Sequence, residues 1–292
     1  MTDPSDATIE PPRPETQFRA ASQLRNPRQF ARTSIRSLRA ALPIARRLFA
    51  RDIRARYRLS ALGFVWIIVP SIAQTFVWLL LNRANILNSG GTTIPLPLFI
   101  LIGTLLWQAF VEALFSPSNQ LSASAQMLSQ VAFPPESLLL SGLADAAVNS
   151  VIRLVIAIPL LVYYDARPGW GLLLTPVGLG ALLLLGFAIG LAIAPFGLLY
   201  QDLTRLLTVV TGFWILVTPV AYAIPPAGDG ISLIRLNPVT PLLDTTRDWL
   251  TGGPVAPGAG MVAVMATSAA LVLIAWTVFR LSVPHLVDRV GT

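Results

Sequence analysis

The chain has 292 residues, of which 54% are hydrophobic and 12% are charged, and its mean hydropathy is +0.67. Soluble domains carry about 25% charged residues, so this composition excludes an ordinary soluble protein and is typical of a membrane protein. The net charge of +7 comes from 21 arginines, because the sequence contains no lysine. The absence of cysteine excludes disulfides, thiolate metal sites and cysteine nucleophiles.

The N-terminal region divides into a polar tail and a basic helix. Residues 1–30 begin with a run rich in proline, acids and threonine, and they are predicted to be a disordered cytoplasmic tail. Residues 31–58 place apolar residues on one side of a helix and arginines on the other, which predicts an amphipathic interface helix at the inner membrane surface. The arginines spaced along its polar face are Arg47, Arg51, Arg54 and Arg58. A basic flank without a binding partner would show the same pattern.

Two residues interrupt this helical pattern. Arg56 falls on the apolar side, where we expect it either to extend toward the lipid headgroups or to pair with Asp52 one turn earlier. Pro43 is expected to mark a break in the helix or its first turn.

The positive charge before the first apolar segment predicts how the chain is oriented. Residues 19–58 contain twelve arginines and one acid. Such a flank is typical of the cytoplasmic side of a membrane rather than of a nucleic-acid site. The first long apolar run begins near Leu59, which predicts a retained anchor instead of a cleaved signal peptide. With an even number of spans, the C-terminal tail, residues 281–292, also lies in the cytoplasm.

Residues 59–280 are predicted to form an all-α domain of six transmembrane helices. Three uncharged stretches of 24, 34 and 31 residues are each long enough to cross a hydrocarbon core of about 30 Å as a helix. The predicted spans are 60–82, 96–116, 138–163, 172–197, 206–224 and 259–280.

Two connections between the predicted spans are long enough to be more than turns. The inner loop, residues 117–137, has a polar first half followed by an apolar patch and two prolines. The outer region, residues 225–258, contains the run NPVTPLLDTTRDWLTGG, in which Pro241 can open a short helix and Gly252 can end it.

Polar residues inside the predicted spans are candidates for a transport path. Asp145, Asn149 and Arg153 recur at i, i+4 and i+8 within the third span, where charged groups usually face a bundle interior or a water-filled route. The same residues could instead satisfy one another within the bundle. Trp66 and Trp107 could line a path and stack on sugar rings, or serve as packing or interfacial residues.

The sequence offers no recognisable set of catalytic residues. It has one histidine, His285, and its acids are scattered, so neither paired carboxylates nor a metal-ligand spacing is present. A phosphate-binding loop needs a lysine, which the chain does not have. If the protein works with ATP, then ATP and magnesium must be bound by another polypeptide, and no cofactor or metal is expected on this chain.

Six motifs follow one another along about residues 45–280. They are FARDIRARYRLSALGFVWIIVPS (49–71), GTLLWQAFVEAL (103–114), MLSQVAFPPESLLL (127–140), YQDLTRLL (200–207), TPVAY (218–222) and NPVTPLLDTTRDWL (237–250). The first motif is a basic stretch that leads through a serine, a glycine and a tryptophan to a proline. In their order and spacing, these motifs resemble the Wzm-like ABC-2 type permeases that export polysaccharides such as O-antigen, galactan and teichoic acid.

The chain departs from the pattern of these permeases at three places. Gln130 stands where they usually have a lysine, Gln201 replaces the arginine of an Arg-Asp pair, and Thr218 replaces the serine of a Ser-Pro-Val run. These changes bear on the charge pairing with a partner ATPase and leave the expected architecture unchanged.

The resemblance implies a half-transporter: a homodimer of this chain with two copies of a separate ATPase subunit. It implies that the loop 117–137 couples to the ATPase, that the helices between spans five and six form an outer gate, and that a polyprenyl-diphosphate-linked glycan meets the arginines of the interface helix. The coupling residues would be Met127, Leu128, Gln130, Val131, Phe133 and Pro134. The gate residues would be Asp202, Arg205 and Pro219.

Three other functions fit parts of the sequence. An exporter of a drug or small lipid would have the same architecture with a narrower and less aromatic path. A membrane-embedded glycosyl or acyl transferase would require catalytic residues that the sequence does not offer. A membrane anchor for a cytoplasmic complex would need neither an ATPase nor a path.

Overall fold

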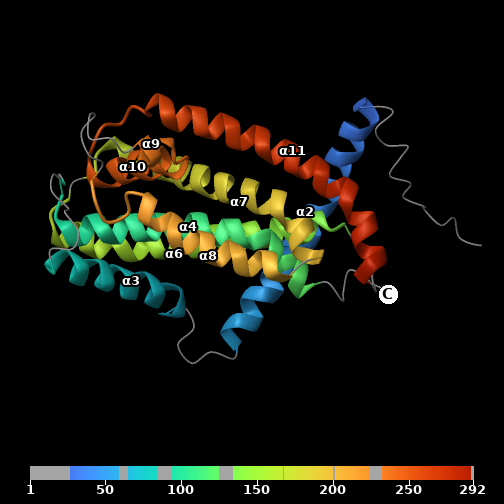
Figure 1. Cartoon of the computed structure of the whole chain (residues 1–292), viewed down its shortest axis with the longest axis horizontal. Coiled ribbons are helices and arrows are strands. Elements are labelled where there is room, and N and C mark those ends of the chain that lie inside the picture. Colours follow the sequence, from blue (N-terminus) through green and yellow to red (C-terminus); the bar gives the residue numbers. More distant parts are fainter. Residues whose placement is uncertain are drawn as a thin grey trace, which may run out of the picture.

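The computed structural model describes residues 27–58, 65–84, 92, 94–124, 134–166, 168–199, 201–223 and 232–290. Every regular element in these ranges is a helix, and they contain no strand, which confirms the all-α class. The long helices run side by side as a bundle (Figure 1). Across one end of the bundle lies α2 (Pro27–Arg58), and at the opposite end lie the short helices α9 (Ser232–Leu236) and α10 (Val239–Thr251).

Five segments of the described chain are long and apolar enough to cross a membrane. The protein is therefore a multi-pass helical membrane protein. The helices in these segments are α3 (Val65–Arg83), α4 (Leu96–Ala123), α6 (Glu136–Tyr163), the short η1 (Trp170–Leu174) continuing into α7 (Thr175–Leu199), and α11 (Ala259–Val290). A further helix, α8 (Gln201–Val217), has 17 residues, so the sixth span stays a prediction.

Several helix ends differ from the predicted bounds. The helix α4 continues to Ala123, so the first part of the predicted loop 117–137 is helical. That part looked like a loop because it is polar, but Asn119 and Gln120 line a cavity, where polar side chains are compatible with a helix. The helix α8 ends at Val217 instead of 224. The helix α11 runs to Val290 through most of the predicted C-terminal tail.

The basic segment near the N-terminus is helical, as predicted. The helix α2 passes through Pro43 without interruption, so the predicted break there is wrong. Its residues Ala41, Ala45 and Leu48 are buried, and the helix packs against α6. Its placement at a membrane surface stays a prediction, and of the predicted tail 1–30 the residues up to 26 lie outside the described ones.

The centre of the bundle is the contact between α4 and α7, which are largely buried within the protein. Gly186 and Gly190, one turn apart on α7, lie against the backbone of α4. A Cβ atom at Gly186 would collide with the carbonyl oxygen of Phe110, and one at Gly190 with that of Leu114. Small residues four apart allow helix backbones to approach closely in membranes.

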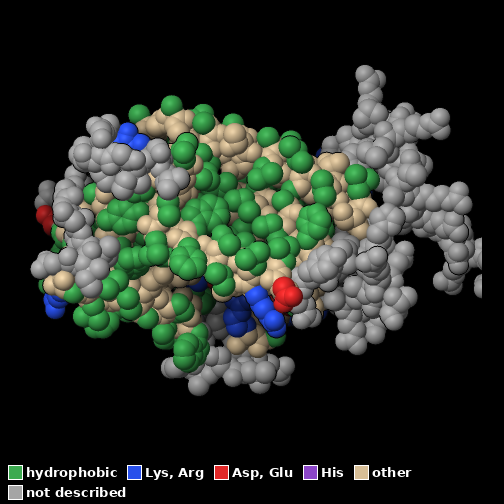
Figure 2. Space-filling view, in the orientation of Figure 1, with side chains coloured by type: hydrophobic (Ala, Val, Ile, Leu, Met, Phe, Trp, Pro, Cys, Tyr) green, Lys and Arg blue, Asp and Glu red, His purple; other side chains and the backbone are tan. Residues whose placement is uncertain are grey.

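The outer surface is apolar between the two ends of the bundle. Hydrophobic side chains cover most of the face in Figure 2, and the charged ones lie mainly toward its ends. The helices α3 and α11 bury little of their length, and α8 exposes large hydrophobic side chains such as Phe213. Such a surface is stable against lipid tails or a partner subunit rather than against water.

We predict that Gly190→Ala destabilises the protein by about 1 to 3 kcal/mol, because the added methyl group would force α7 away from the backbone of Leu114. Thermal unfolding in detergent would measure the change. The matched control is Gly180→Ala on the same helix, where nothing lies within 4 Å of the added Cβ. Equal melting temperatures for the two variants would contradict the prediction.

Candidate functional site

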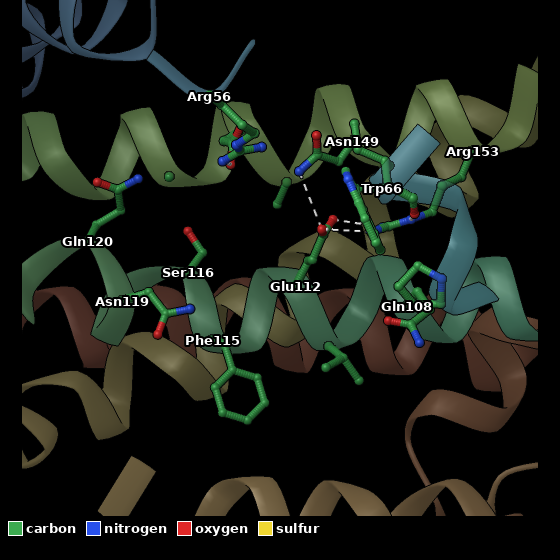
Figure 3. Close-up of a pocket in the computed structure, with 16 residues that line it drawn as sticks. Arg56, Trp66, Gln108, Glu112, Phe115, Ser116, Asn119, Gln120, Asn149 and Arg153 are labelled. Carbon is green, nitrogen blue, oxygen red and sulfur yellow. Dashed lines mark hydrogen bonds and ion pairs between the residues drawn. The ribbon is translucent and has the colours of Figure 1, made fainter. Parts of the chain in front are cut away.

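A polar cavity of about 580 Å³ lies among α2, α3, α4 and α6 (Figure 3). Four of the five predicted path residues line it: Trp66, Asp145, Asn149 and Arg153. The helix α4 contributes a row of polar side chains from Gln108 to Gln120 on the facing wall. The structure thus brings residues from four helices to one hollow.

An ion pair that the sequence reasoning missed holds one wall of the cavity. Arg153 donates to both carboxylate oxygens of Glu112, with Nη1 to Oε2 at 2.8 Å and Nη2 to Oε1 at 2.7 Å. Its Nε donates to the backbone carbonyl of Ile67 on α3 at 3.1 Å. Asn149 Nδ2 also donates to Glu112 at 3.3 Å. The Arg153 side chain is 7% exposed and that of Glu112 is 29% exposed, so the bidentate pair joins a buried guanidinium to a carboxylate that faces the cavity.

A second ion pair crosses the cavity near α2. Arg56 Nη2 lies 2.7 Å from Asp145 Oδ2, so the arginine on the apolar side of α2 reaches α6. Asp52, the partner considered from the sequence, lies 2.9 Å from Arg51 instead. The cavity therefore contains two cations and two carboxylates, each cation facing a carboxylate.

Uncharged polar groups supply the remaining hydrogen-bonding capacity of the cavity. Gln108, Asn119 and Gln120 present amides to it, and Gln108 donates to Gln74 at 3.0 Å. The buried hydroxyl of Ser116 has no hydrogen-bond partner in the described part of the chain. With its charges balanced, the cavity is suited to neutral ligands with many hydroxyl groups more than to a bare anion.

Trp107, the fifth predicted path residue, lies elsewhere. It is 3% exposed and packs against Phe110 and Trp214, with ring centroids 5.3 Å and 6.3 Å away. Trp66, by contrast, is 59% exposed at the cavity. The structure therefore places only one of the two tryptophans where it could contact a solute in this hollow.

The predicted diphosphate site falls on the exposed side of α2. Arg47, Arg51 and Arg54 are all exposed there. Arg58 ends the helix, and its side chain lies outside the described residues.

Most of the predicted coupling residues also lie outside the described residues: Met127, Leu128, Gln130, Val131 and Phe133. Pro134, the last of the set, is described. Its carbonyl accepts a hydrogen bond from the Ser137 hydroxyl at 2.7 Å.

The three predicted gate residues do not meet. Asp202 and Arg205 form an exposed pair at 3.3 Å on the first turn of α8, while Pro219 follows the other end of that helix. At about 1.5 Å per residue, the length of α8 separates them.

Pro219 instead belongs to a contact with the short helix α10. Arg247 on α10 donates from Nη2 to the carbonyl of Pro219 at 2.8 Å and from Nη1 to Asp244 at 3.0 Å. Its guanidinium carbon stacks 3.7 Å from the ring centre of Phe99. Burial raises the pKa of Asp244 to about 6, although Arg247 opposes the rise, and burial lowers the pKa of Arg247 to about 10. Sequence reasoning missed this contact.

These features define a class: a helical membrane protein with a charge-balanced polar cavity among α2, α3, α4 and α6, and short helices packed at the end of the bundle opposite α2. The chain is 26% identical over 240 residues to the O-antigen export system permease protein RfbA of Myxococcus xanthus, covering 80% of this chain and 90% of that protein. This homology confirms the resemblance to Wzm-like ABC-2 permeases seen in the motifs. No protein-family model matches the chain.

We predict that Arg153→Gln lowers the free energy of unfolding by about 1 to 3 kcal/mol, because Glu112, partly exposed in the cavity, would lose its bidentate partner. The double variant Arg153→Gln with Glu112→Gln should lose less than the sum of the two single changes. Thermal unfolding of all four proteins measures the coupling.

The matched control is the exposed pair Asp202 and Arg205. The same comparison of single and double variants there should give a coupling free energy below about 1 kcal/mol. Additive losses at Arg153 and Glu112 would show that the buried pair does not couple.

We predict that the short helix α10 becomes more stable as the pH falls from about 6 toward 4. The pKa of Asp244 is higher in the folded protein than in the unfolded chain, so the folded state binds the proton more tightly, and acid favours folding. Hydrogen exchange of residues 239–251, corrected for intrinsic rates, should show added protection of roughly 1 to 2 kcal/mol at the lower pH. Asp244→Asn should reduce this dependence, and an unchanged pH dependence in that variant would refute the assignment.

Proposed function

We propose that this chain is the transmembrane permease subunit of an ATP-driven exporter that moves a polyprenyl-diphosphate-linked polysaccharide from the cytoplasm across the bacterial inner membrane. The observation that carries the proposal is the homology to an O-antigen export permease, which extends over 90% of that protein's length. The multi-pass helical fold and the polar cavity support it.

ATP hydrolysis belongs to a separate subunit in this proposal. A phosphate-binding loop requires a lysine, and the 21 basic residues of this chain are all arginine. Two ATPase subunits would therefore bind two copies of the permease. The loop that contains Met127, Leu128, Gln130, Val131 and Phe133 is the proposed contact with the ATPase, because its apolar patch is followed by two prolines that fix its exit into α6.

The exposed apolar helices support a homodimer. Phe76 on α3 is 60% exposed and Phe213 on α8 is 68% exposed, although both helices pack against α4 on other faces. A second copy covering these faces would complete the walls of a path between the two subunits, with lipid tails covering the remainder.

The proposed orientation places α2 at the cytoplasmic surface and α9 with α10 at the outer surface. These elements lie at opposite ends of the bundle (Figure 1). Arginines are concentrated on α2, as expected for the cytoplasmic side. With α8 as the sixth span, both ends of the chain face the cytoplasm.

The arginines of α2 and the polar cavity would bind different parts of the substrate. The exposed arginines of α2 offer positive charge to a diphosphate at the membrane surface. The cavity, whose cations already face Glu112 and Asp145, offers amides and hydroxyls to neutral sugar units, and Trp66 offers an aromatic face.

We predict that deletion of the gene causes lipid-linked glycan to accumulate in the cytoplasm, because the donor lipid would be made but not exported. The wild-type chain should restore export, and Arg51→Gln with Arg54→Gln should reduce restored export about tenfold or more by removing two of the exposed charges. Surface glycan and cytoplasmic lipid-linked glycan are measured together.

The matched control is Arg39→Gln with Arg46→Gln, which removes the same charge from exposed positions elsewhere on α2. That control should restore export. A deletion strain with normal surface glycan and no intracellular accumulation would contradict the proposed substrate. Absence of an ATPase from the purified complex would contradict the proposed mechanism.

A further inference from the structure

One buried carboxylate joins three helices at the end of the bundle where α2 lies. Glu136, the first residue of α6, is 4% exposed. Its Oε1 accepts a hydrogen bond from Ser37 of α2 at 3.3 Å and lies 3.4 Å from Nε of Arg280 on α11. Arg280 also donates from Nη1 to the hydroxyl of Ser34 on α2. We refer to Ser34, Ser37, Glu136 and Arg280 as the Glu136 clasp.

The burial of the clasp makes it costly to break. The side chains of Glu136 and Arg280 are 5% and 13% exposed, so removal of either partner leaves a buried charge without its counter-ion. A pair of this kind adds little net stability relative to apolar packing, but it defines one arrangement of the groups that it joins. The clasp therefore fixes where α2 and α11 lie relative to the first turn of α6.

The clasp begins at the residue that follows the predicted coupling loop. Pro134 and Pro135 precede Glu136, and their φ angles are fixed by their rings. The carbonyl of Pro134 accepts bonds from both the backbone N–H and the hydroxyl of Ser137, at 3.0 Å and 2.7 Å. Pro134 is thus hydrogen-bonded to the first turn of α6. A displacement of Pro134 would therefore be passed directly to Glu136.

A second ion pair joins α2 to α6 away from the clasp. Arg56 joins α2 to Asp145, nine residues further along α6. Ser37 and Arg56 are 19 residues apart, or about 28 Å along the helix. Because α2 is joined to α6 at two separated points, the helices share their motion, and the exposed arginines between those points move with them.

We propose that Glu136 is a positioning residue that makes α2, α6 and α11 move as one body. Through Glu136, a displacement of the segment between α4 and α6 would be passed to the arginine face of α2. This inference rests on the proposed function, because the partner ATPase supplies the displacement. It assigns a transmission role to residues that contact neither ATP nor the glycan.

The test measures export per ATP hydrolysed by the complete transporter, purified with its ATPase and reconstituted in vesicles loaded with lipid-linked glycan. Glu136→Gln should retain assembly and ATP hydrolysis while export per ATP falls about tenfold. The double charge reversal Glu136→Arg with Arg280→Glu should recover part of the lost export per ATP. Neither single reversal should recover it. The matched control is Ser282→Ala, near the same end of α11, which should keep the wild-type ratio.

A covalent link gives an independent version of the test, because the chain has no native cysteine. The variant Ser37→Cys with Glu136→Cys should be uncoupled when reduced. A short bifunctional thiol reagent that joins α2 to α6 should restore export per ATP, since a rigid body needs only the attachment. Cross-linking that lowers export further would overturn the inference.

The outcomes separate the inference from the proposed function. If the wild-type complex exports nothing with ATP, the proposed function fails and the inference falls with it. If the wild-type complex exports glycan and every clasp variant has the same export per ATP as the wild type, only the inference fails. A parallel loss of ATP hydrolysis and export in Glu136→Gln, with export per ATP unchanged, would show a merely structural role and would also overturn it.

Discussion

Arg153 uses its whole guanidinium to hold Glu112 on α4 and the carbonyl of Ile67 on α3. A charge placed among apolar helices must have a partner, because hydrocarbon offers it no water. This requirement decides where three helices meet, and it leaves the other polar groups of α4 facing a hollow instead of lipid. The pair joins two walls of the cavity, and the charge balance of the cavity follows from the same rule.

The same chemistry attaches the peripheral helices to the bundle. Arg56 and Arg280 hold α2 and α11 to the first half of α6, and Arg247 holds α10 to the end of α8. In each case a long cationic side chain crosses between two separate elements of the fold. Arginine suits this role because its planar group makes several directed bonds at once, which a lysine ammonium does not match in geometry. The absence of lysine from the chain is consistent with this use of the cationic residues.

The sequence predicted what depends on local pattern and missed what depends on distant partners. Apolar runs and arginine spacing were sufficient for the helical class, for α2 and for the short helix that ends at Gly252 in the left-handed conformation. The pairing of Arg56 with Asp145, 89 residues apart, has no local signal. Glu112 did have one, since it is the single acid of its predicted span, and an acid at that depth requires a cation. The polar end of α4 was mistaken for a loop because hydropathy does not distinguish a cavity wall from solvent.

The distribution of these contacts along α8 has a mechanical consequence. The end near Val217 is held by polar bonds, because Asn237 bonds to Thr218 and Trp214 while Arg247 bonds to the carbonyl of Pro219. At the Gln201 end, the ion pair between Asp202 and Arg205 lies within the helix itself. Among the described residues, displacement of that end would therefore separate apolar surfaces without breaking an ion pair between helices, which costs far less in a membrane than exposing a charge. In the proposed exporter, this asymmetry would let α8 move at its Gln201 end while its other end stays attached to α10.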